Sequence, residues 1–330
     1  MRGYRVGIVG PRSAFAQRVR ALLSEGELPV TEIKLFESEL DGEGTTLTQF
    51  GDEVVVTQPL DPELFPHLDV LFVSGEGTDT LNRVASEAAG EGVLTLVEGS
   101  VGLGAPVVTP QNPEALGSSE SRLGILPRVE SYLLGTTLAP IAKAHTIVRA
   151  VSTVLVPAHS KGDAGAAELH QQVVHILNFK APPTEVLQEQ LAFNVKPLGG
   201  SGEGGLSLAD AVAWEASRLA GIEGVLTVSL VQVPVFHGYS AALWVETKEP
   251  VEPRAVRSLF RSKPFDAPKS TRGTRPPSPV SVAGTESIHI GPIRRGTGAG
   301  PPGFWLWAVA DTTAYDPGRA GVEIVRSVLS

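Results

Sequence analysis

The chain has 330 residues, a formal net charge of −9 at pH 7, 42% hydrophobic and 19% charged residues, and no cysteine. This length and composition are typical of a globular protein of about two domains. The negative charge gives no electrostatic basis for binding nucleic acid or an anionic membrane, both of which attract clustered Lys and Arg. The lack of cysteine excludes disulfides, thiolate metal sites and a cysteine nucleophile.

The start of the sequence resembles the first strand of a domain and not a leader peptide. A strand-like run begins at Tyr4, and no apolar stretch approaches the length needed to cross a bilayer. We therefore expect a cytoplasmic protein without membrane or nucleic-acid partners.

The first third of the chain alternates short apolar runs with amphipathic segments, which is typical of a parallel sheet with crossover helices. The expected strands are 4–9, 33–36, 53–57, 69–73 and 93–97. A helical stripe of Leu81, Val84, Ala85 and Ala88 precedes Gly90, where a left-handed residue is expected to end the helix. This pattern predicts a Rossmann-type α/β domain.

From about residue 125 the β-branched runs become longer, which predicts an α+β second domain. Its expected strands are 146–156, 225–235, 239–247 and 304–310, and its expected helices are 163–178 and 208–220. Ser207 and Asp210 form a capping-box pattern before the second of these helices. A last helix over 316–328, with Asp316 at the N-cap and Pro317 at its first position, is expected to return to the first domain.

Three polar or glycine-rich stretches interrupt this second part of the chain. Residues 199–205 resemble a linker, and 262–281 have neither the periodicity nor the apolar content expected of packed structure, so both are expected to be mobile. Residues 295–303 begin like a second glycine loop, but Pro301 and the lack of a following helix favour a surface turn. After it, Trp305 and Trp307 alternate along a strand and are expected to pack at a domain or dimer contact.

The stretch VGIVGPRSAFAQRV, residues 6–19, resembles the phosphate loop of a dinucleotide-binding unit. Such a loop uses one glycine for the bend, a second for close approach to the pyrophosphate and a third where helix meets strand. Here Gly10 is present, whereas Ser13 and Ala16 stand at the other two positions and Pro11 follows the bend. The loop is therefore either a weakened nucleotide site, in which Arg12 contacts a phosphate, or a relic of the fold.

The second expected strand ends in acidic residues, and an acid at that place accepts hydrogen bonds from an adenosine ribose and repels a 2′-phosphate. If a cofactor binds, Glu37 therefore favours NAD over NADP, although a charge run of this kind is more often a set of solvated surface carboxylates. No cofactor is certain from these residues, and NAD and NADP both stay open. The candidate cofactor contacts are Gly7, Gly10, Arg12, Ser13, Ala14, Phe15, Glu37, Ser38, Ser74 and Gly75.

Several separated stretches together resemble the aspartate-β-semialdehyde dehydrogenases, which are enzymes of amino-acid biosynthesis. They include VGIVGPRSAFAQRV, DVLFVSGEG, LAFNVKP, VQVPVFHGYSAALWVET and FWLWAVAD, in the order and spacing of that family. The resemblance implies an NADP-binding domain over 1–127 and 313–330, and a catalytic and dimerisation domain over 128–312. It also implies a homodimer and a C-terminal helix that returns to the first domain.

The same resemblance implies a reaction through a cysteine thioester, and this chain departs from the family at each position that carries it. Val129 stands in place of the cysteine, Leu155 of a glutamine, Gln232 of the substrate-clamping arginine and Tyr239 of the acid/base histidine. Leu208 and Ala211 replace a glutamate and a phosphate-binding lysine, and the family's phosphate-binding F-R string is missing from LVEGSVGLGAPVV. The chain thus resembles the branch of the family that lacks the catalytic cysteine.

Substitute groups are few. Glu130 follows Val129, but an acyl anhydride is a poor hydride acceptor compared with a thioester. His237 is expected to share a face with Tyr239 on an extended strand, which makes it a candidate proton donor. His170 and His175 do not have the spacing of a metal-binding pair on a helix, so no metal site is expected.

Two functions of different class follow from this pattern. The first is a non-catalytic homodimer that keeps the dehydrogenase fold as a binding or interaction module, with a protein partner or a nucleotide as its ligand. The second is an NAD(P)-dependent oxidoreductase that acts on a different substrate without a thioester and uses Tyr239 or His237 as the proton donor.

Overall fold

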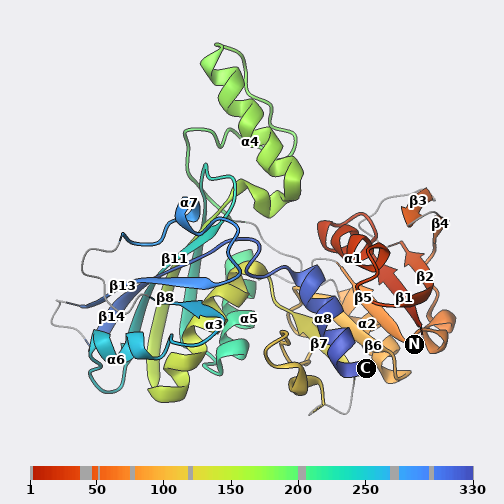
Figure 1. The fold of residues 1–330 in the computed structure, drawn as a ribbon, viewed down its shortest axis with the longest axis horizontal. Helices are drawn as coiled ribbons and strands as arrows, with labels where there is room; N and C mark the ends of the chain where they lie inside the picture. Colours follow the sequence, from red (N-terminus) through yellow and green to blue (C-terminus); the bar gives the residue numbers. More distant parts are fainter. Residues whose placement is uncertain are drawn as a thin grey trace. The chain divides into compact units, whose positions relative to one another are not determined.

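The computed structural model of this chain describes residues 3–37, 47–50, 53–74, 79–117, 122–199, 206–267, 275–296 and 301–329; the side chains of 47–49 and 53 are not described. The chain divides into two compact units (Figure 1). Unit 1 comprises Met1–Arg128, Gly202–Leu206 and Asp316–Ser330, and unit 2 comprises Val129–Ser201 and Ser207–Tyr315. The expected domain boundaries at 127 and 313 lie next to the observed ends at 128 and 315.

Unit 1 contains a seven-stranded sheet in the order β3-β4-β2-β1-β5-β6-β7, in which every pair is parallel except β3 with β4. Its strands are β1 (Tyr4–Val9), β2 (Val30–Phe36), β3 (Leu47–Phe50), β4 (Glu53–Gln58), β5 (Val70–Val73), β6 (Leu94–Glu98) and β7 (Leu123–Leu126). Its helices are α1 (Ala14–Ser24), η1 (Pro62–His67), α2 (Asp79–Gly90), η2 (Pro113–Leu116) and α8 (Pro317–Leu329). This confirms the predicted parallel α/β domain.

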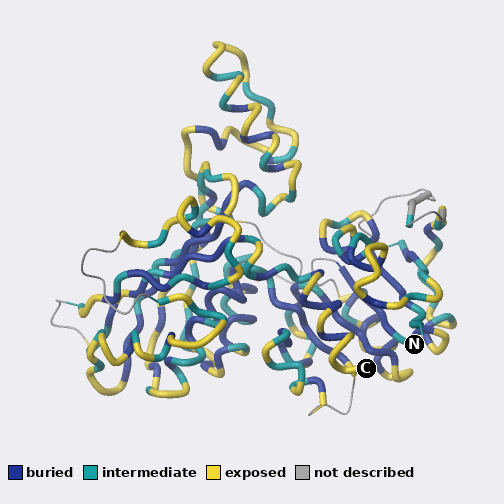
Figure 2. The backbone as a smooth tube through the Cα atoms, viewed as in Figure 1, coloured by how far each residue is buried: buried dark blue, intermediate teal, exposed yellow. Residues whose placement is uncertain are grey.

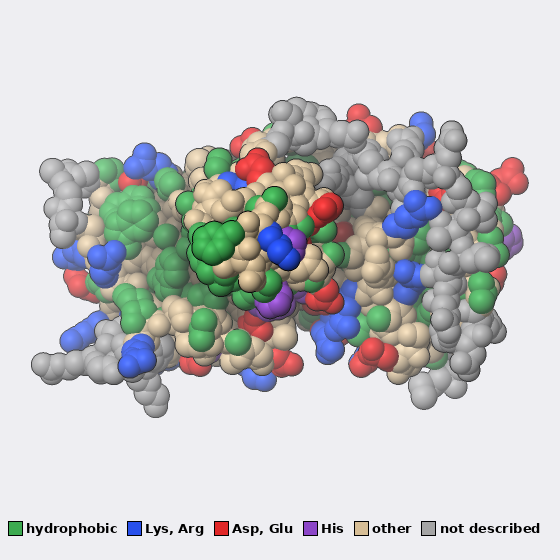
Figure 3. Space-filling view, turned by 90° about the horizontal axis from the view of Figure 1, so that it is seen from above, with side chains coloured by type: hydrophobic (Ala, Val, Ile, Leu, Met, Phe, Trp, Pro, Cys, Tyr) green, Lys and Arg blue, Asp and Glu red, His purple; other side chains and the backbone are tan. Residues whose placement is uncertain are grey.

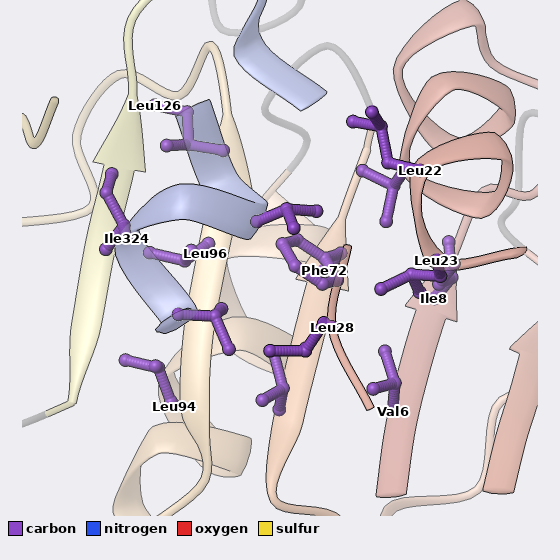
Figure 4. Close-up of a cluster of buried hydrophobic side chains, with 14 of the residues drawn as sticks. Val6, Ile8, Leu22, Leu23, Leu28, Phe72, Leu94, Leu96, Leu126 and Ile324 are labelled. Atoms are coloured by element: carbon purple, nitrogen blue, oxygen red, sulfur yellow. The ribbon is translucent and has the colours of Figure 1, made fainter. Parts of the chain in front are cut away.

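The core of unit 1 lies between this sheet and helices α1 and α8. Figure 4 shows aliphatic side chains of the strands, among them Val6, Ile8 and Leu96, facing Leu22 of α1 and Ile324 of α8. The residues of the central strands β1, β5 and β6 are nearly all buried, so these strands are continuous apolar runs and are easy to recognise in the sequence.

The C-terminal helix α8 is fixed at its start by Asp316, as predicted. The Asp316 carboxylate accepts a hydrogen bond from the Arg319 amide at 2.9 Å and one from Arg18 Nε of α1 at 2.9 Å. The predicted end of α2 needs a correction, because Gly90 is still helical and the left-handed residue is Gly92, with φ +83°. The left-handed glycine that follows the helix is thus two residues later than predicted.

Unit 2 contains a second seven-stranded sheet, in the order β12-β13-β14-β11-β8-β10-β9. Its strands are β8 (Ile147–Val156), β9 (Lys196–Pro197), β10 (Leu226–Gln232), β11 (Tyr239–Thr247), β12 (Phe265–Asp266), β13 (Ile288–Arg295) and β14 (Gly303–Ala310). Its helices are α3 (Val129–Ala144), η3 (Ala158–Lys161), α4 (Gly162–Leu177), α5 (Leu208–Ala220), α6 (Pro253–Ser258) and α7 (Pro279–Val282). Parallel and antiparallel pairs are mixed, as an α+β domain requires.

The two faces of the unit 2 sheet differ in cover. Helices α3 and α5 lie on one face, where Ala150 and Val154 of β8 are buried (Figures 1 and 2). On the opposite face Val151 pairs with Trp244 and Trp244 with Trp305, and Val151 and Trp305 are 39% and 43% exposed. We call this second surface, which no described helix covers along β8 and β11, the open face.

A helical arm extends from the unit 2 sheet (Figure 1). It consists of α4 and the return limb, residues 178–195, which leads back to β9. The return limb contains almost no regular structure, so its backbone groups bond to side chains of α4 instead. Gln172 donates to the Pro183 and Glu189 carbonyls and accepts from the Leu191 and Ala192 amides, at 2.7–3.0 Å.

The segment 262–281, predicted to be unpacked, is partly ordered. Phe265 of β12 pairs with Ile288 and packs against Phe260, with ring centroids 4.9 Å apart, and Ser278 caps α7. The side chain of Phe265 anchors this short strand. The sequence interpretation used the average composition of 262–281, in which one aromatic residue has little weight. Residues 268–274, 200–205 of the predicted linker and 297–300 of the predicted turn lie outside the described residues.

Candidate functional site

The glycine-containing loop after β1 leads directly into α1 at the carboxyl end of the unit 1 sheet. Gly10 has φ +75°, and a Cβ there would lie 2.8 Å from the Ser74 carbonyl oxygen, so only glycine fits without strain. Ser13 has an extended backbone with φ −64° and caps α1 by accepting a hydrogen bond from the Ala16 amide at 3.0 Å. Since Gly10 alone has positive φ in this loop, Ser13 and Ala16 do not strain it.

Several predicted cofactor contacts in this loop belong instead to the core. Gly7 lies inside β1, where a Cβ would meet Leu68 and Leu71 side chains at 2.7 Å. Phe15 is 4% exposed and packs edge-on against Phe72, with centroids 6.2 Å apart. A phosphate loop and a buried strand–helix junction both need small or apolar residues at these positions. The sequence alone therefore did not distinguish a cofactor contact from a core residue.

The remaining predicted cofactor residues surround the end of the sheet. Arg12 and Ala14 are exposed beside Gly10, and Glu37 directly follows β2. Ser74, at the end of β5, is buried and donates its hydroxyl to Glu98 at 3.3 Å. The predicted contacts Ser38 and Gly75 lie outside the described residues.

In unit 2 the sheet brings Gln232 and Tyr239 together on its helix-covered face. Gln232 pairs with Val156 of β8, and the pairing of Ser240 with Leu155 places Tyr239 on the other side of Val156. Gln232 is 1% exposed and Tyr239 is 4% exposed. The Gln232 Nε2 atom has no hydrogen-bond partner among the described residues.

Glu130, in the first turn of α3, lies close enough to affect the Tyr239 phenol. Burial, and in second place the negative charge of Glu130, raise the pKa of Tyr239 well above its usual value. The phenol therefore keeps its proton at every ordinary pH and can donate a hydrogen bond, but it cannot act as a general base. Glu130, set aside in the sequence, is thus the one acid that the geometry associates with this site.

His237 does not share a face with Tyr239, which corrects the expectation from strand alternation. β11 begins only at Tyr239, and Gly238 has φ +87°, so the backbone turns between the two residues. His237 is exposed and its ring lies 4.6 Å from that of His159, whose Nδ1 is 3.5 Å from the Asp163 carboxylate. The two candidate proton donors therefore belong to different environments.

Other predicted positions fall around this region. Val129 is the first residue of α3, and Leu208 and Ala211 begin α5, which packs beside α3. Leu155 lies on the open face, because its neighbours Val154 and Val156 point into the core. The structure thus groups Val129, Gln232 and Tyr239 on one side of the sheet and separates Leu155 from them.

The buried polar groups around α3 and α5 were missed in the sequence. Glu215 of α5 is fully buried, and Tyr132 stacks on Tyr315 with ring centroids 4.0 Å apart. A charged residue within an apolar helical stripe, AVAWEASRLA, was the available signal for Glu215.

The described part of the chain carries neither a metal-binding cluster nor a membrane-spanning helix. It contains no group of three or more His, Asp or Glu side chains that could hold a metal ion. His175 bonds through Nδ1 to the Ala181 carbonyl at 2.8 Å, inside the arm. No described helix is both long and apolar enough to cross a membrane.

Comparison with known proteins identifies the fold and the family. The family model described as "Semialdehyde dehydrogenase, dimerisation domain" matches residues 138–314, more than half of the chain. The chain belongs to the semialdehyde dehydrogenase family. The aspartate-semialdehyde dehydrogenase of Aquifex aeolicus is 26% identical over 336 aligned residues, which cover 98% of this chain and 97% of the relative.

Solved structures of the family share this architecture. Aspartate semialdehyde dehydrogenase II from Vibrio cholerae superposes with a TM-score of 0.77 at 24% identity and covers 99% of both chains. The enzyme from Candida albicans, solved with NADP, gives a TM-score of 0.67 at 16% identity and covers 98% of this chain and 99% of the other. These likenesses confirm the predicted pairing of a Rossmann-type domain with a mixed-sheet domain.

Proposed function

We propose that this chain is a non-catalytic member of the aspartate-semialdehyde dehydrogenase family that acts as a homodimeric binding or interaction module. The observation that carries the proposal is the absence of cysteine from all 330 residues, with Val129 at the matching position. A thioester cannot form without a thiol, so the family's covalent chemistry has no nucleophile here.

The geometry of the matching residues supports the same conclusion. Gln232 carries a neutral amide at the position of the family's arginine, whose guanidinium is charged. Tyr239 carries a phenol with a raised pKa at the position of the family's acid/base histidine. Beside them lies the carboxylate of Glu130, which repels an anionic substrate such as an acyl phosphate. Removal of cations from a buried site lowers the cost of desolvation and leaves a stable but inert core.

The decisive test is an assay of the purified protein in the oxidative direction, with aspartate semialdehyde, inorganic phosphate and NADP. We expect no NADPH formation above that of buffer, for the wild type and equally for Val129→Cys, because the thiol alone restores neither the clamp nor the base. Turnover by the wild-type protein would overturn the proposal.

A nicotinamide cofactor is the second part of the proposal. The Gly10 turn and Glu37 after β2 support an NAD-type site, and the fold is shared with an enzyme solved with NADP. Calorimetric titration with NADH and then NADPH tests it, and tighter binding of NADH is expected. If neither binds, the loop is a relic and the chain is a protein-interaction module alone.

The alternative oxidoreductase function needs a proton donor in contact with substrate. Tyr239 is buried and His237 is exposed elsewhere, so the geometry favours the non-catalytic function over a redox reaction that uses either group. If a substrate screen finds any NAD(P)-dependent turnover, its loss in His237→Ala or Tyr239→Phe would support the alternative.

Homodimerisation is the third part. The matched domain is a dimerisation domain, and the open face of unit 2 exposes Val151 and Trp305 beside Trp244. Aromatic side chains on an uncovered sheet are typical of interface centres. Sedimentation velocity is expected to show a dimer for the wild type and a weakened dimer for Trp305→Ser.

A further inference from the structure

Arg20 of α1 is a partly buried cation without an acidic partner in the described part of the chain. Its Nε atom is buried and makes no hydrogen bond with any described residue. The arginines Arg5 and Arg18 of the same unit, in contrast, pair with Asp69 and Asp316 at 3.1 and 2.9 Å. A desolvated charge without a partner destabilises a folded protein, so the packing of the chain does not explain why Arg20 is there.

The pKa of Arg20 reflects the lack of a compensating acid. Burial lowers the pKa of Arg20 from its usual value, whereas the hydrogen bond from Arg5 to Asp69 raises the pKa of Arg5. An arginine nevertheless stays protonated at neutral pH. Unit 1 therefore holds a full positive charge at this place without a negative charge beside it.

The guanidinium of Arg20 is directed at the loop that leads from β1 into α1. Arg20 lies about two turns into the helix, and its side chain runs back toward the helix start, where Nη2 donates to the Pro11 carbonyl at 3.2 Å. Gln17, on the same flank of the helix, donates through Nε2 to the Arg12 carbonyl at 2.8 Å. The two side chains thus hold consecutive carbonyls of the loop against the flank of α1.

This arrangement leaves main-chain donors at the start of α1 for a ligand. In a trans peptide the carbonyl and the following N–H point in opposite directions, so the bond from Arg20 to the Pro11 carbonyl turns the Arg12 amide away from Arg20. The main-chain amides of Ala14 and Phe15, in the first turn of α1, form no hydrogen bond with described residues. Such donors fit the oxygens of a phosphate group.

The molecule as a whole offers little attraction to an anion. The net charge of the chain is −9, and on the face seen in Figure 3 the Lys and Arg side chains are scattered among Asp and Glu side chains. A cation held directly behind the loop therefore supplies a local attraction that the overall charge does not.

We propose that Arg20 is a positioning residue for the phosphate groups of a nucleotide, because it holds the Pro11 carbonyl against α1 and places a positive charge behind the loop. The inference rests on the nicotinamide-nucleotide site proposed above and assigns part of its affinity to a residue outside the glycine loop. The unpaired charge is costly in the free protein, and a bound phosphate compensates it.

Isothermal titration calorimetry of the full chain with NADH tests the proposal. Arg20→Met keeps an apolar stem without the charge, and its NADH dissociation constant is expected to rise at least about tenfold. Arg20→Lys keeps the charge and a donor for the Pro11 carbonyl, and is expected to stay within about threefold of the wild type. The control Arg326→Met removes an exposed arginine that contacts Glu27, beyond the far end of α1, and leaves the constant unchanged.

Each outcome has a distinct meaning, and the melting temperature of each variant verifies that it is folded. Weak binding by Arg20→Met together with rescue by Arg20→Lys supports the proposal. An Arg20→Met constant within about twofold of the wild type overturns the role of Arg20 and leaves the nucleotide site intact. Equal losses in the two variants assign the effect to arginine packing and overturn the role of the charge. A wild type that binds neither NADH nor NADPH overturns both this inference and the nucleotide site.

A second neutral variant covers the case in which Arg20→Met does not fold. Arg20→Gln retains an amide donor and lacks the charge, so its NADH dissociation constant is also expected to rise at least about tenfold. The same limit of about twofold decides against the proposal.

Discussion

Gln232 is the buried residue of the candidate site on which the proposed loss of catalysis can be examined at the scale of one side chain. An arginine at this point of β10 would carry a charge and need a partner, whereas the glutamine is neutral and its Nε2 still makes no hydrogen bond among the described residues. An orphan buried donor costs more than an apolar group of the same size. The position is thus adapted neither to substrate binding nor fully to stability.

Replacement of Gln232 by leucine is therefore expected to stabilise the protein by about 1 kcal/mol, because it removes the unpaired amide at nearly constant volume. Urea unfolding, followed by circular dichroism, measures the change in the free energy of unfolding. Val154→Ala, which removes two methyl groups from the same core, is the control and is expected to lower the free energy of unfolding. A loss of more than about 1 kcal/mol in Gln232→Leu would mean that the amide has a partner, such as a bound ligand.

The buried tyrosines predict how stability depends on pH. Burial raises the pKa of Tyr132 to about 12 and that of Tyr239 well above 10. The folded state keeps these protons above pH 10, where the unfolded state loses them, so stability is complete below pH 10 and falls as the pH rises beyond it. The slope is about 1.4 kcal/mol per pH unit for each group.

Denaturant titrations at pH 9, 10 and 11 check this dependence, and Tyr132→Phe provides the comparison. The variant lacks one of the two phenols whose pKa is raised, so its stability is expected to fall less steeply between pH 10 and 11. Equal slopes in the two proteins would contradict the assigned shift for Tyr132.

Among the elements, those with a clear period were predictable and those without one were not. β1 and β11 begin and end where alternation and flanking residues predict. α3 was missed because it is buried on nearly all sides and contains Pro140, which argues against a helix in the sequence. β7 and β13 were missed for a related reason, since short or interrupted apolar runs carry little periodicity.

The site was predictable only in part. The positions matched to the family's catalytic groups are a prediction from the sequence, and their grouping depends on strand register, which places Leu155 on the open face and His237 outside β11. Gly7 and Phe15 were predicted to contact a cofactor, and the structure packs both in the core, Gly7 inside β1 and Phe15 in the first turn of α1. Burial could not be inferred from spacing alone.

The arm gives the prediction at the scale of an element. Gln172→Ala removes four hydrogen bonds that hold the return limb and leaves the Leu191 and Ala192 amides buried without partners. We expect a loss of about 2–4 kcal/mol in the local stability of the arm. Hydrogen exchange of residues 186–192 measures it, with the strands of unit 1 as internal reference; unchanged protection there would contradict the role of Gln172.

For the whole molecule, the similarity extends over nearly the full chain at 26% identity to the aspartate-semialdehyde dehydrogenase of Aquifex aeolicus, whereas the function proposed here requires that the residues of its chemistry differ. Core positions tolerate replacement as long as volume and pattern are kept, whereas a catalytic group has no substitute of different chemistry. A sequence that conserves scaffold strings and loses charged site residues together is consistent with selection for binding or assembly in place of turnover.

The net charge of −9 then decides how the proposed dimer responds to salt. Two copies of one acidic chain repel each other over about 10 Å at 0.1 M ionic strength, and the contacts assigned to the open face are apolar. Added salt screens the repulsion and leaves the apolar contacts intact, so dissociation constants are expected to fall several-fold between about 20 and 300 mM NaCl. Sedimentation velocity in the two buffers tests this, and a dimer that weakens with salt would instead indicate an interface held by ion pairs.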